Sequence, residues 1–185
     1  MSTRFARPSR TGAGRRPIPS PFQPTHPTHM PELDYTRIRV AIAAAAWNSA
    51  VTDEMLAGAV DALRGKGIDA SSIRVVRCPG AYELPLAVKW LLEMNDENGP
   101  AYDAVVAIGA VIRGGTPHFE YVCDAVNRGV TGLILQFGRP VGFGVLTTDT
   151  VAQAMERAGR SKGNKGAEAA LAACSMLELR GDLAS

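Results

Sequence analysis

No stretch of this sequence contains the roughly 20 consecutive apolar residues that a transmembrane helix needs. The N-terminal region also lacks the continuous apolar segment of a secretion signal, although 46% of all residues are hydrophobic. We therefore expect a soluble cytoplasmic protein that has no membrane partner. At 185 residues, the chain is long enough for one domain with a sizeable core and too short for two ordinary domains.

Cysteine is scarce, and Cys78, Cys123 and Cys174 lie far apart in apolar contexts. Their odd number and wide spacing suit reduced thiols in a core better than disulfides or a metal site. The sequence also has no cluster with metal-ligand spacing, no serine in a nucleophile elbow and no dinucleotide fingerprint. We therefore expect a function that requires neither a metal nor a bound cofactor.

Acidic residues are absent from residues 1–31, which carry five arginines. The formal net charge of +2 is therefore uneven, because the rest of the chain has 15 basic and 18 acidic residues. We interpret residues 1–35 as a basic, proline-rich, disordered arm and residues 36–185 as the folded domain. The arm has neither interleaved aromatic residues nor an amphipathic period, so we do not expect nucleic acid as a partner.

Patterns typical of strands and helices alternate along the folded part. The predicted strands run from Ile38 to near Trp47 and over residues 73–78, 104–112 and 141–146, and the predicted helices cover residues 51–63, 84–92, 119–130, 150–158 and 167–179. Residues 159–166, GRSKGNKG, are predicted to form a polar turn. The segment 104–112 is apolar at nearly every position, as a central parallel strand covered on both faces must be. The alternation predicts a parallel sheet between two helical layers, with its ligand at the carboxyl ends of the strands.

The predicted central strand ends in the segment IRGGTPH. Gly114 and Gly115 permit a tight turn with exposed amides, Thr116 is a suitable N-cap, and Pro117 suits the first helical position. Such a helix start favours a phosphate group, although an ordinary capped turn explains the segment equally well. His118 lies beside the positive end of the helix dipole, so we expect a largely neutral imidazole that can accept and return protons.

Two other strand ends carry residues suited to a flat ligand. Trp47, followed by Asn48, either belongs to the core or stacks on a planar ring. Gly80 and Ala81 permit a flat ligand to approach the backbone closely. Glu83 either accepts hydrogen bonds from hydroxyl groups or caps its own helix.

Phe143, Arg157 and Lys165 accompany the last predicted strand and the segments after it. Each cation either binds an anion or is a solvated surface charge. Taken together, the four strand ends offer a surface for a flat ring, an acceptor for hydroxyl groups, a phosphate site with cations, and His118. They favour a metal-free enzyme that joins a phosphorylated small molecule to an aromatic partner.

Five segments resemble a known family in order and spacing: WNSAVTDEMLAGAVDAL, CPGAYELPLAVK, AIGAVIRGGTPHFEYVCDAVNRG, PVGFGVLTTDTVAQAMERAG and GNKGAEAALA. They are similar to lumazine synthase, the penultimate enzyme of riboflavin biosynthesis, over about residues 38–179. The resemblance implies an α/β fold, a flavodoxin-like three-layer αβα sandwich with four parallel strands, in which the N-terminal segment can add to a neighbour's sheet. It also implies condensation of 5-amino-6-(D-ribitylamino)uracil with 3,4-dihydroxy-2-butanone 4-phosphate, giving 6,7-dimethyl-8-ribityllumazine, phosphate and water.

The resemblance also implies a role for each candidate residue. His118 would carry protons, while the phosphate would be held by Gly115, Thr116 and Arg157. The pyrimidine and its ribityl chain would contact Trp47, Asn48, Ala81, Tyr82, Glu83, Ala110, Val111, Ile112, Phe143 and Lys165. In this family, residues that follow the start of the fourth strand serve a neighbouring subunit, so Phe143 and Arg157 are expected in an adjacent site. Trp47 departs from the family pattern, which usually has phenylalanine there.

Members of this family form pentamers, and some close twelve pentamers into a shell of sixty subunits. The short segment GRSKGNKG resembles the shell-forming type, but the sequence leaves pentamer and shell open. Riboflavin synthase is a candidate partner. Three alternatives to the synthase are a paralogue such as the archaeal-type riboflavin synthase, a non-catalytic shell or flavin-binding protein, and a protein that binds nucleic acid through its arm. The phosphate residues argue against the paralogue, because the conversion of two lumazines needs no phosphate site. His118 argues against the non-catalytic protein, because binding without chemistry does not require a proton carrier.

Overall fold

The fold is that of a computed structural model, and residues 33–184 of it are described. The predicted arm therefore lies almost entirely outside the described residues. Leu33 and Tyr35, which precede Thr36, are partly buried against the core. A 3-10 helix, η1 (Tyr35–Arg37), follows, with the Asp34 side chain accepting a hydrogen bond from the backbone N–H of Thr36.

The centre of the domain is a four-stranded sheet in the order β2-β1-β5-β6. All its neighbouring strands pair in parallel, and they comprise β1 (Val40–Ala45), β2 (Ile73–Cys78), β5 (Ala104–Ile112) and β6 (Val141–Thr148). The predicted parallel sheet is confirmed. β6 extends past the predicted end at Leu146, since Thr147 and Thr148 pair with Val111 and Ile112.

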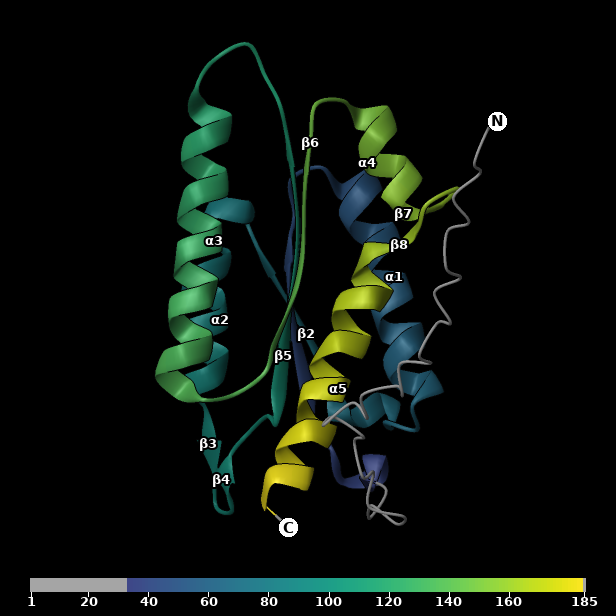
Figure 1. Cartoon of the computed structure of the whole chain (residues 1–185), viewed down its shortest axis with the longest axis vertical. Helices are drawn as coiled ribbons and strands as arrows, with labels where there is room; N and C mark the ends of the chain where they lie inside the picture. The colour runs from purple at the N-terminus through teal and green to yellow at the C-terminus, as the bar shows by residue number, and fades with distance from the viewer. Residues whose placement is uncertain (1–32, 185) are drawn as a thin grey trace, which may run out of the picture. The chain divides into compact units, whose positions relative to one another are not determined.

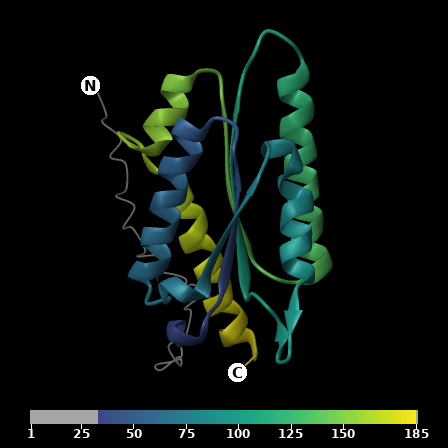
Figure 2. The same cartoon turned by 180° about the vertical axis from the view of Figure 1, so that it is seen from behind.

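Helices cover both faces of the sheet, as Figures 1 and 2 show from opposite sides. One layer contains α2 (Leu84–Glu93) and α3 (His118–Phe137), and the other contains α1 (Ser49–Gly65), α4 (Val151–Arg157) and α5 (Lys165–Ala184). Each layer closes its own hydrophobic cluster against the sheet. β1 is buried at every position and β5 at all but its last, which explains their apolar sequences. The predicted three-layer αβα sandwich is confirmed.

The predicted polar turn of residues 159–166 is wrong, because this segment contributes to a small antiparallel hairpin. The hairpin pairs β7 (Ala158–Arg160) with β8 (Gly163–Asn164), and Gly163 has a φ of 73° that few other residues adopt. α5 then begins at Lys165 rather than the predicted Ala167, because the Asn164 side chain accepts hydrogen bonds from the first backbone N–H groups of the helix.

Three other small elements have no counterpart in the sequence-based prediction. They are the 3-10 helices η2 (Ala70–Ser72) and η3 (Ala81–Glu83) and a hairpin of β3 (Asn95–Asp96) with β4 (Gly99–Pro100). Within residues 33–184, no helix combines the length and hydropathy that crossing a membrane requires. The three cysteines are free thiols, of which Cys78 and Cys174 are buried and Cys123 is half-buried. Burial raises the pKa of each thiol.

Candidate active site

A pocket of about 720 Å³ lies at the carboxyl ends of the central strands. It is lined by residues from the β1–α1 turn, η3, the end of β5 and the start of α3: Trp47, Asn48, Ala81, Tyr82, Glu83, Ala110, Val111, Ile112, His118, Tyr121 and Val122. Nine of these residues were expected from the sequence. The fold therefore brings together segments that are up to about 75 positions apart in the chain.

Trp47 lies at the pocket instead of in the core, with 69% of its surface exposed. The β1–β2 pairing continues past the strand ends, because the N–H of Trp47 donates to the carbonyl of Pro79 at 3.0 Å. A Cβ on Gly80 would lie 3.1 Å from Cε3 of Trp47, so the missing side chain makes room for the indole. Asn48 adopts the left-handed conformation, and its Nδ2 donates to the Ala110 carbonyl at 2.8 Å.

The wall formed by η3 depends on a second glycine. A Cβ on Gly109 of β5 would lie 2.8 Å from Cδ1 of Leu84, so glycine lets η3 and the start of α2 pack closely on the strand. The sequence left two roles open for Glu83. In the structure, its Oε2 accepts a hydrogen bond from the N–H of Gly80 at 2.9 Å, so the cap is formed. The other carboxylate oxygen has no hydrogen bond among residues 33–184 and remains an acceptor at the pocket.

His118 is exposed and is the first residue of α3. The prediction that Thr116 is the N-cap and Pro117 the first helical residue is wrong by one position. Pro117 is the N-cap, and its carbonyl accepts from the N–H of Glu120 at 3.2 Å, which starts the helix one residue later. Gly115 and Thr116 are exposed in the loop before this helix and do not line the pocket.

Arg113 fastens this loop to the end of β6. Its backbone N–H donates to the Thr148 carbonyl at 2.9 Å, and its Nε donates to Asp149 at 2.9 Å. Its guanidinium also pairs with Glu120 and lies 4.1 Å from the ring centre of Phe119. Arg113 lowers the pKa of Glu120 mainly through this hydrogen bond. One side chain thus joins the first turn of α3 to the loop that precedes α4.

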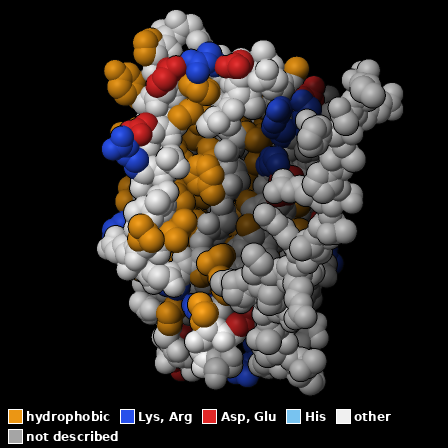
Figure 3. Space-filling model, viewed as in Figure 1, with side chains coloured by type: hydrophobic (Ala, Val, Ile, Leu, Met, Phe, Trp, Pro, Cys, Tyr) orange, Lys and Arg blue, Asp and Glu red, His pale blue; other side chains and the backbone are white. Residues whose placement is uncertain are grey.

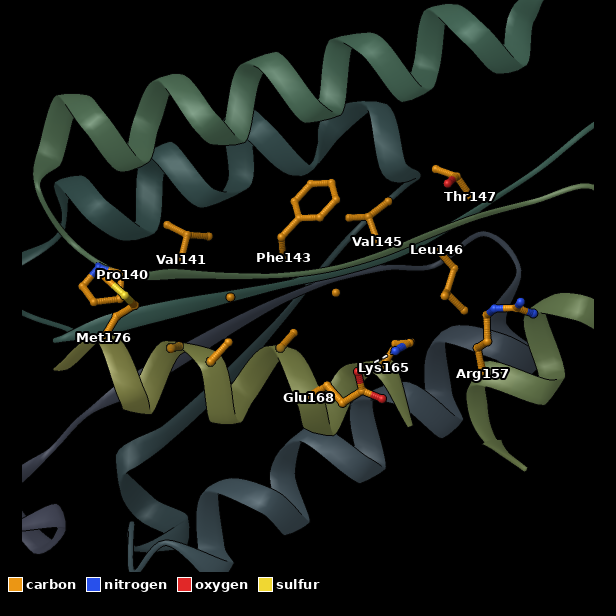
Figure 4. Close-up of a pocket in the computed structure, with 15 residues that line it drawn as sticks. Pro140, Val141, Phe143, Val145, Leu146, Thr147, Arg157, Lys165, Glu168 and Met176 are labelled. Carbon is orange, nitrogen blue, oxygen red and sulfur yellow. Dashed lines mark hydrogen bonds and ion pairs between the residues drawn. The ribbon is translucent and has the colours of Figure 1, made fainter. Parts of the chain in front are cut away.

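Phe143, Arg157 and Lys165 line a second pocket of about 590 Å³, which lies along β6, the edge strand, and the start of α5. Figure 4 shows Phe143 on the side of β6 that faces away from α5, while Arg157 and Lys165 lie on the α5 side. None of the three lines the pocket that contains His118. In a single chain, the two sets of candidate residues therefore line separate pockets.

Both cations of the second pocket have partners in the structure. Nζ of Lys165 donates to Glu168 at 2.5 Å, drawn as a dashed line in Figure 4. Nη1 of Arg157 donates to the Gln153 carbonyl at 2.8 Å and lies 3.7 Å from Glu156. Each ion pair is partly exposed, so water weakens it and an incoming anion can compete for the cation. The second pocket can therefore offer two positive charges to an anionic ligand.

A family model described as 6,7-dimethyl-8-ribityllumazine synthase matches residues 37–181. The match spans the four strands of the sheet, both pockets and all of the sandwich except the last three residues of α5. The chain belongs to this family. Membership in the lumazine synthase family indicates an enzyme with a transferase-type reaction that acts on small molecules.

Tyr121 and Val122 line the His118 pocket but were not among the predicted site residues of this lumazine synthase family member. Both lie on α3 within four positions of His118. Residues three and four apart share a helix face, so helical spacing from His118 was the signal that could have identified them. Tyr121 is 71% exposed and is a third aromatic side chain of the pocket, in addition to Trp47 and Tyr82.

Proposed function

We propose that this chain condenses 5-amino-6-(D-ribitylamino)uracil with 3,4-dihydroxy-2-butanone 4-phosphate to form 6,7-dimethyl-8-ribityllumazine. The observation that carries the proposal is the His118 pocket. It combines an exposed indole, the lining segments 81–83 and 110–112 and a histidine at a helix start in a chain of the lumazine synthase family. We also propose that the product serves riboflavin biosynthesis.

The pyrimidine ring fits the flat part of the pocket. Trp47 offers the large exposed surface on which a planar ring stacks. The segments 81–83 and 110–112 would line the ring and the ribityl chain, and Glu83 and Asn48 supply polar groups beside them. The indole is larger than the phenylalanine usual in the family, so we expect the stacking role to persist in a reshaped pocket.

His118 is the proton carrier in this proposal. The pyrimidine amine adds to the ketone carbon, and a first water leaves as the imine forms. His118 then takes a proton from the carbon beside the imine, and the phosphate group leaves with its bonding electrons. The enol so formed becomes a ketone by proton transfer. The ribityl-bearing nitrogen attacks that ketone, and a second water leaves as the ring closes.

The phosphate would sit at the start of α3, where exposed N–H groups and the helix dipole favour an anion. Gly115 and Thr116 would supply backbone groups there, and Arg157 would supply a positive charge. We propose that this arginine comes from an adjacent chain, together with Phe143 and Lys165. The separation of the two pockets within one chain supports a site shared between neighbours.

Self-association is supported by the surface around β6. Figure 3 shows hydrophobic side chains gathered on the face where β6 runs between α3 and α5. Large exposed apolar residues on these elements include Leu135, Phe143, Met176, Leu179 and Leu183. Surfaces of this kind mark sites of association. We propose a pentamer, and the short hairpin of residues 158–164 is compatible with further closure into a shell of sixty chains.

Sedimentation or light scattering distinguishes these assemblies. The pentamer predicts a particle of about five times the chain mass of 19.6 kDa, and the shell predicts about sixty times that mass. A monodisperse monomer would contradict both assemblies and the shared site.

The reaction itself is tested by mixing the purified protein with the two proposed substrates and following lumazine fluorescence. We expect product to form faster than in a protein-free control, with the mass of dimethyl-ribityllumazine. A folded protein that binds the pyrimidine but gives no acceleration would contradict the synthase and favour a flavin-binding or scaffold role. A riboflavin synthase paralogue would instead consume added lumazine.

A further inference from the structure

Asn164 forms a hydrogen-bond junction between α1, β7 and the start of α5, and only the last of these lines the second pocket. Its Nδ2 donates to the Glu54 carbonyl on α1 at 2.8 Å and to the Ala158 carbonyl in β7 at 3.0 Å. Its Oδ1 accepts from the backbone N–H groups of Gly166 and Ala167 at 2.9 and 3.0 Å. The four bonds use both donors and both acceptor sites of one amide group, and a flipped amide would make none of them.

Two glycines leave room for this side chain. A Cβ on Gly58 of α1 would lie 2.2 Å from Nδ2 of Asn164. A Cβ on Gly166 of α5 would lie 1.9 Å from the carbonyl oxygen of Met55 and 3.0 Å from Oδ1 of Asn164. Any larger residue at either position would force the two helices or the amide to move. The packing of α1, α5 and the hairpin is therefore built around Asn164.

The junction borders both cations of the second pocket. Arg157 immediately precedes Ala158, whose carbonyl accepts from Asn164, and Lys165 immediately follows Asn164. The hairpin between them contains Gly159 and Gly163 with φ of 131° and 73°, backbone conformations that glycine adopts readily and other residues rarely adopt. Between the two cations, the hydrogen bonds from Nδ2 of Asn164 tie this hairpin to α1.

We infer that Asn164 is a positioning residue that sets Arg157 and Lys165 relative to each other for ligand binding. The inference rests on the proposed function for its ligand, the phosphorylated substrate. Asn164 itself does not touch the ligand. It acts through the two Nδ2 donors, which hold the end of α4 and the hairpin against α1, while Oδ1 fixes the start of α5.

Two substitutions separate this role from helix capping alone. Asn164→Ser keeps a side-chain acceptor for the start of α5 but removes both amide N–H donors, and its single shorter hydroxyl cannot replace the bonds to Glu54 and Ala158 together. Serine is as good an N-cap as asparagine. Asn164→Asp keeps the size and the acceptor but points a carboxylate oxygen at the carbonyls of Glu54 and Ala158. If capping were the only role, both variants would behave like the unaltered protein.

The matched control is Asn95→Asp, which makes the same chemical change at an asparagine that donates only to the nearby carbonyl of Glu93. Asn95 lies in β3 and lines neither pocket.

The measurement is KM for the phosphorylated substrate and kcat, on full-length assembled protein, together with the midpoint of thermal unfolding. We expect KM to rise about tenfold in Asn164→Ser and further in Asn164→Asp, with kcat within about twofold and Asn95→Asp unchanged. A fall in unfolding midpoint without a rise in KM would overturn the inference, because it would mean a purely structural role. Should Asn164→Asp fail to fold, Asn164→Ser alone decides in the same way.

Calorimetric titration with inorganic phosphate gives a readout that does not need turnover. If the unaltered protein makes no lumazine, the proposed function fails, and the phosphate affinities then decide the inference separately. Weaker phosphate binding by Asn164→Ser, with normal binding by Asn95→Asp, supports the positioning role. Equal phosphate binding by the unaltered protein, Asn164→Ser and Asn95→Asp contradicts the positioning role. An absence of phosphate binding by all three also contradicts it.

Discussion

Gly142→Ala is predicted to destabilise the protein, because β6 and α5 approach each other closely at this glycine. A Cβ added there would lie 2.2 Å from the carbonyl oxygen of Ala169 and 2.8 Å from its carbonyl carbon. Ordinary contacts of a Cβ begin at about 3.4 Å, so the strand and helix must separate by roughly 1 Å. Both atoms belong to the backbone, so no side-chain rotation relieves the clash. Overpacking of this kind costs about 1–3 kcal/mol.

For a chain of this length, about 2 kcal/mol corresponds to a fall of roughly 4–8 °C in the unfolding midpoint. Circular dichroism during heating, at one fixed protein concentration, measures it. Gly132→Ala is the control, because that glycine lies within α3 and an added Cβ would have no side chain and no backbone of another segment within 4 Å, its chain neighbours apart. Alanine there favours the helix by about 0.5–1 kcal/mol, so the midpoint should rise. A midpoint for Gly142→Ala equal to or above that of the unaltered protein would refute the close packing of β6 on α5.

His118→Ala should lower kcat by about 10²–10⁴-fold while pyrimidine affinity, measured by calorimetry, stays nearly unchanged, and retention of full turnover would exclude a proton-carrier role. Arg157→Ala should mainly raise KM for the phosphorylated substrate, and an equal rise for the pyrimidine would argue against a phosphate contact. Tyr35 and Lys66 donate to Glu178 at 2.6 and 2.9 Å, and these bonds lower its pKa. Stability from this group is present above the ordinary glutamate pKa of 4.5 and is lost as pH falls through the lowered value. In urea titrations over acidic pH, Tyr35→Phe should therefore show a smaller loss of stability, and an identical loss would mean that the Tyr35 bond contributes nothing.

The sheet could be predicted because its strands have distinctive sequences. The segment 104–112 is apolar at nearly every position, and the structure buries all of it except Ile112, which is half-buried. The helices α1 and α2 could also be predicted, because glycine or proline marks an end of each run of apolar residues at helical spacing. Local pattern and tertiary burial agree in these elements, so a rule based on periodicity succeeds.

The hairpin of residues 158–164 could not be predicted, because its cause is not local. Asn164 reaches a carbonyl on α1 that lies 110 positions earlier in the chain, and no turn rule contains that partner. The start of α3 was missed by one residue for a related reason. Thr116 is a good N-cap by type, but Pro117 already supplies the first accepting carbonyl, so residue preference alone gave the wrong boundary.

The candidate site also has a part that the sequence could predict and a part that depends on contacts between distant segments. Glycine after β2 and a histidine after β5 were visible in the sequence, and the alternation of elements placed both at one edge of the sheet. Which side chains share a pocket depended on contacts between distant segments, such as the bond from Asn48 to the Ala110 carbonyl. Tyr121 and Val122 were missed for a different reason, because their local signal, helical spacing from His118 on α3, was not applied.

The most direct test of the proposed mechanism is to co-express His118→Ala and Arg157→Ala chains with different tags and to purify the mixed assemblies. At a substrate concentration far below the raised KM, each variant alone should be nearly inactive. If His118 and Arg157 come from adjacent chains, random mixing leaves both residues intact in about a quarter of the sites, and lumazine formation should recover to that extent. Activity no higher than that of the separate variants would mean that each site lies within one chain, and the proposed shared site would be wrong.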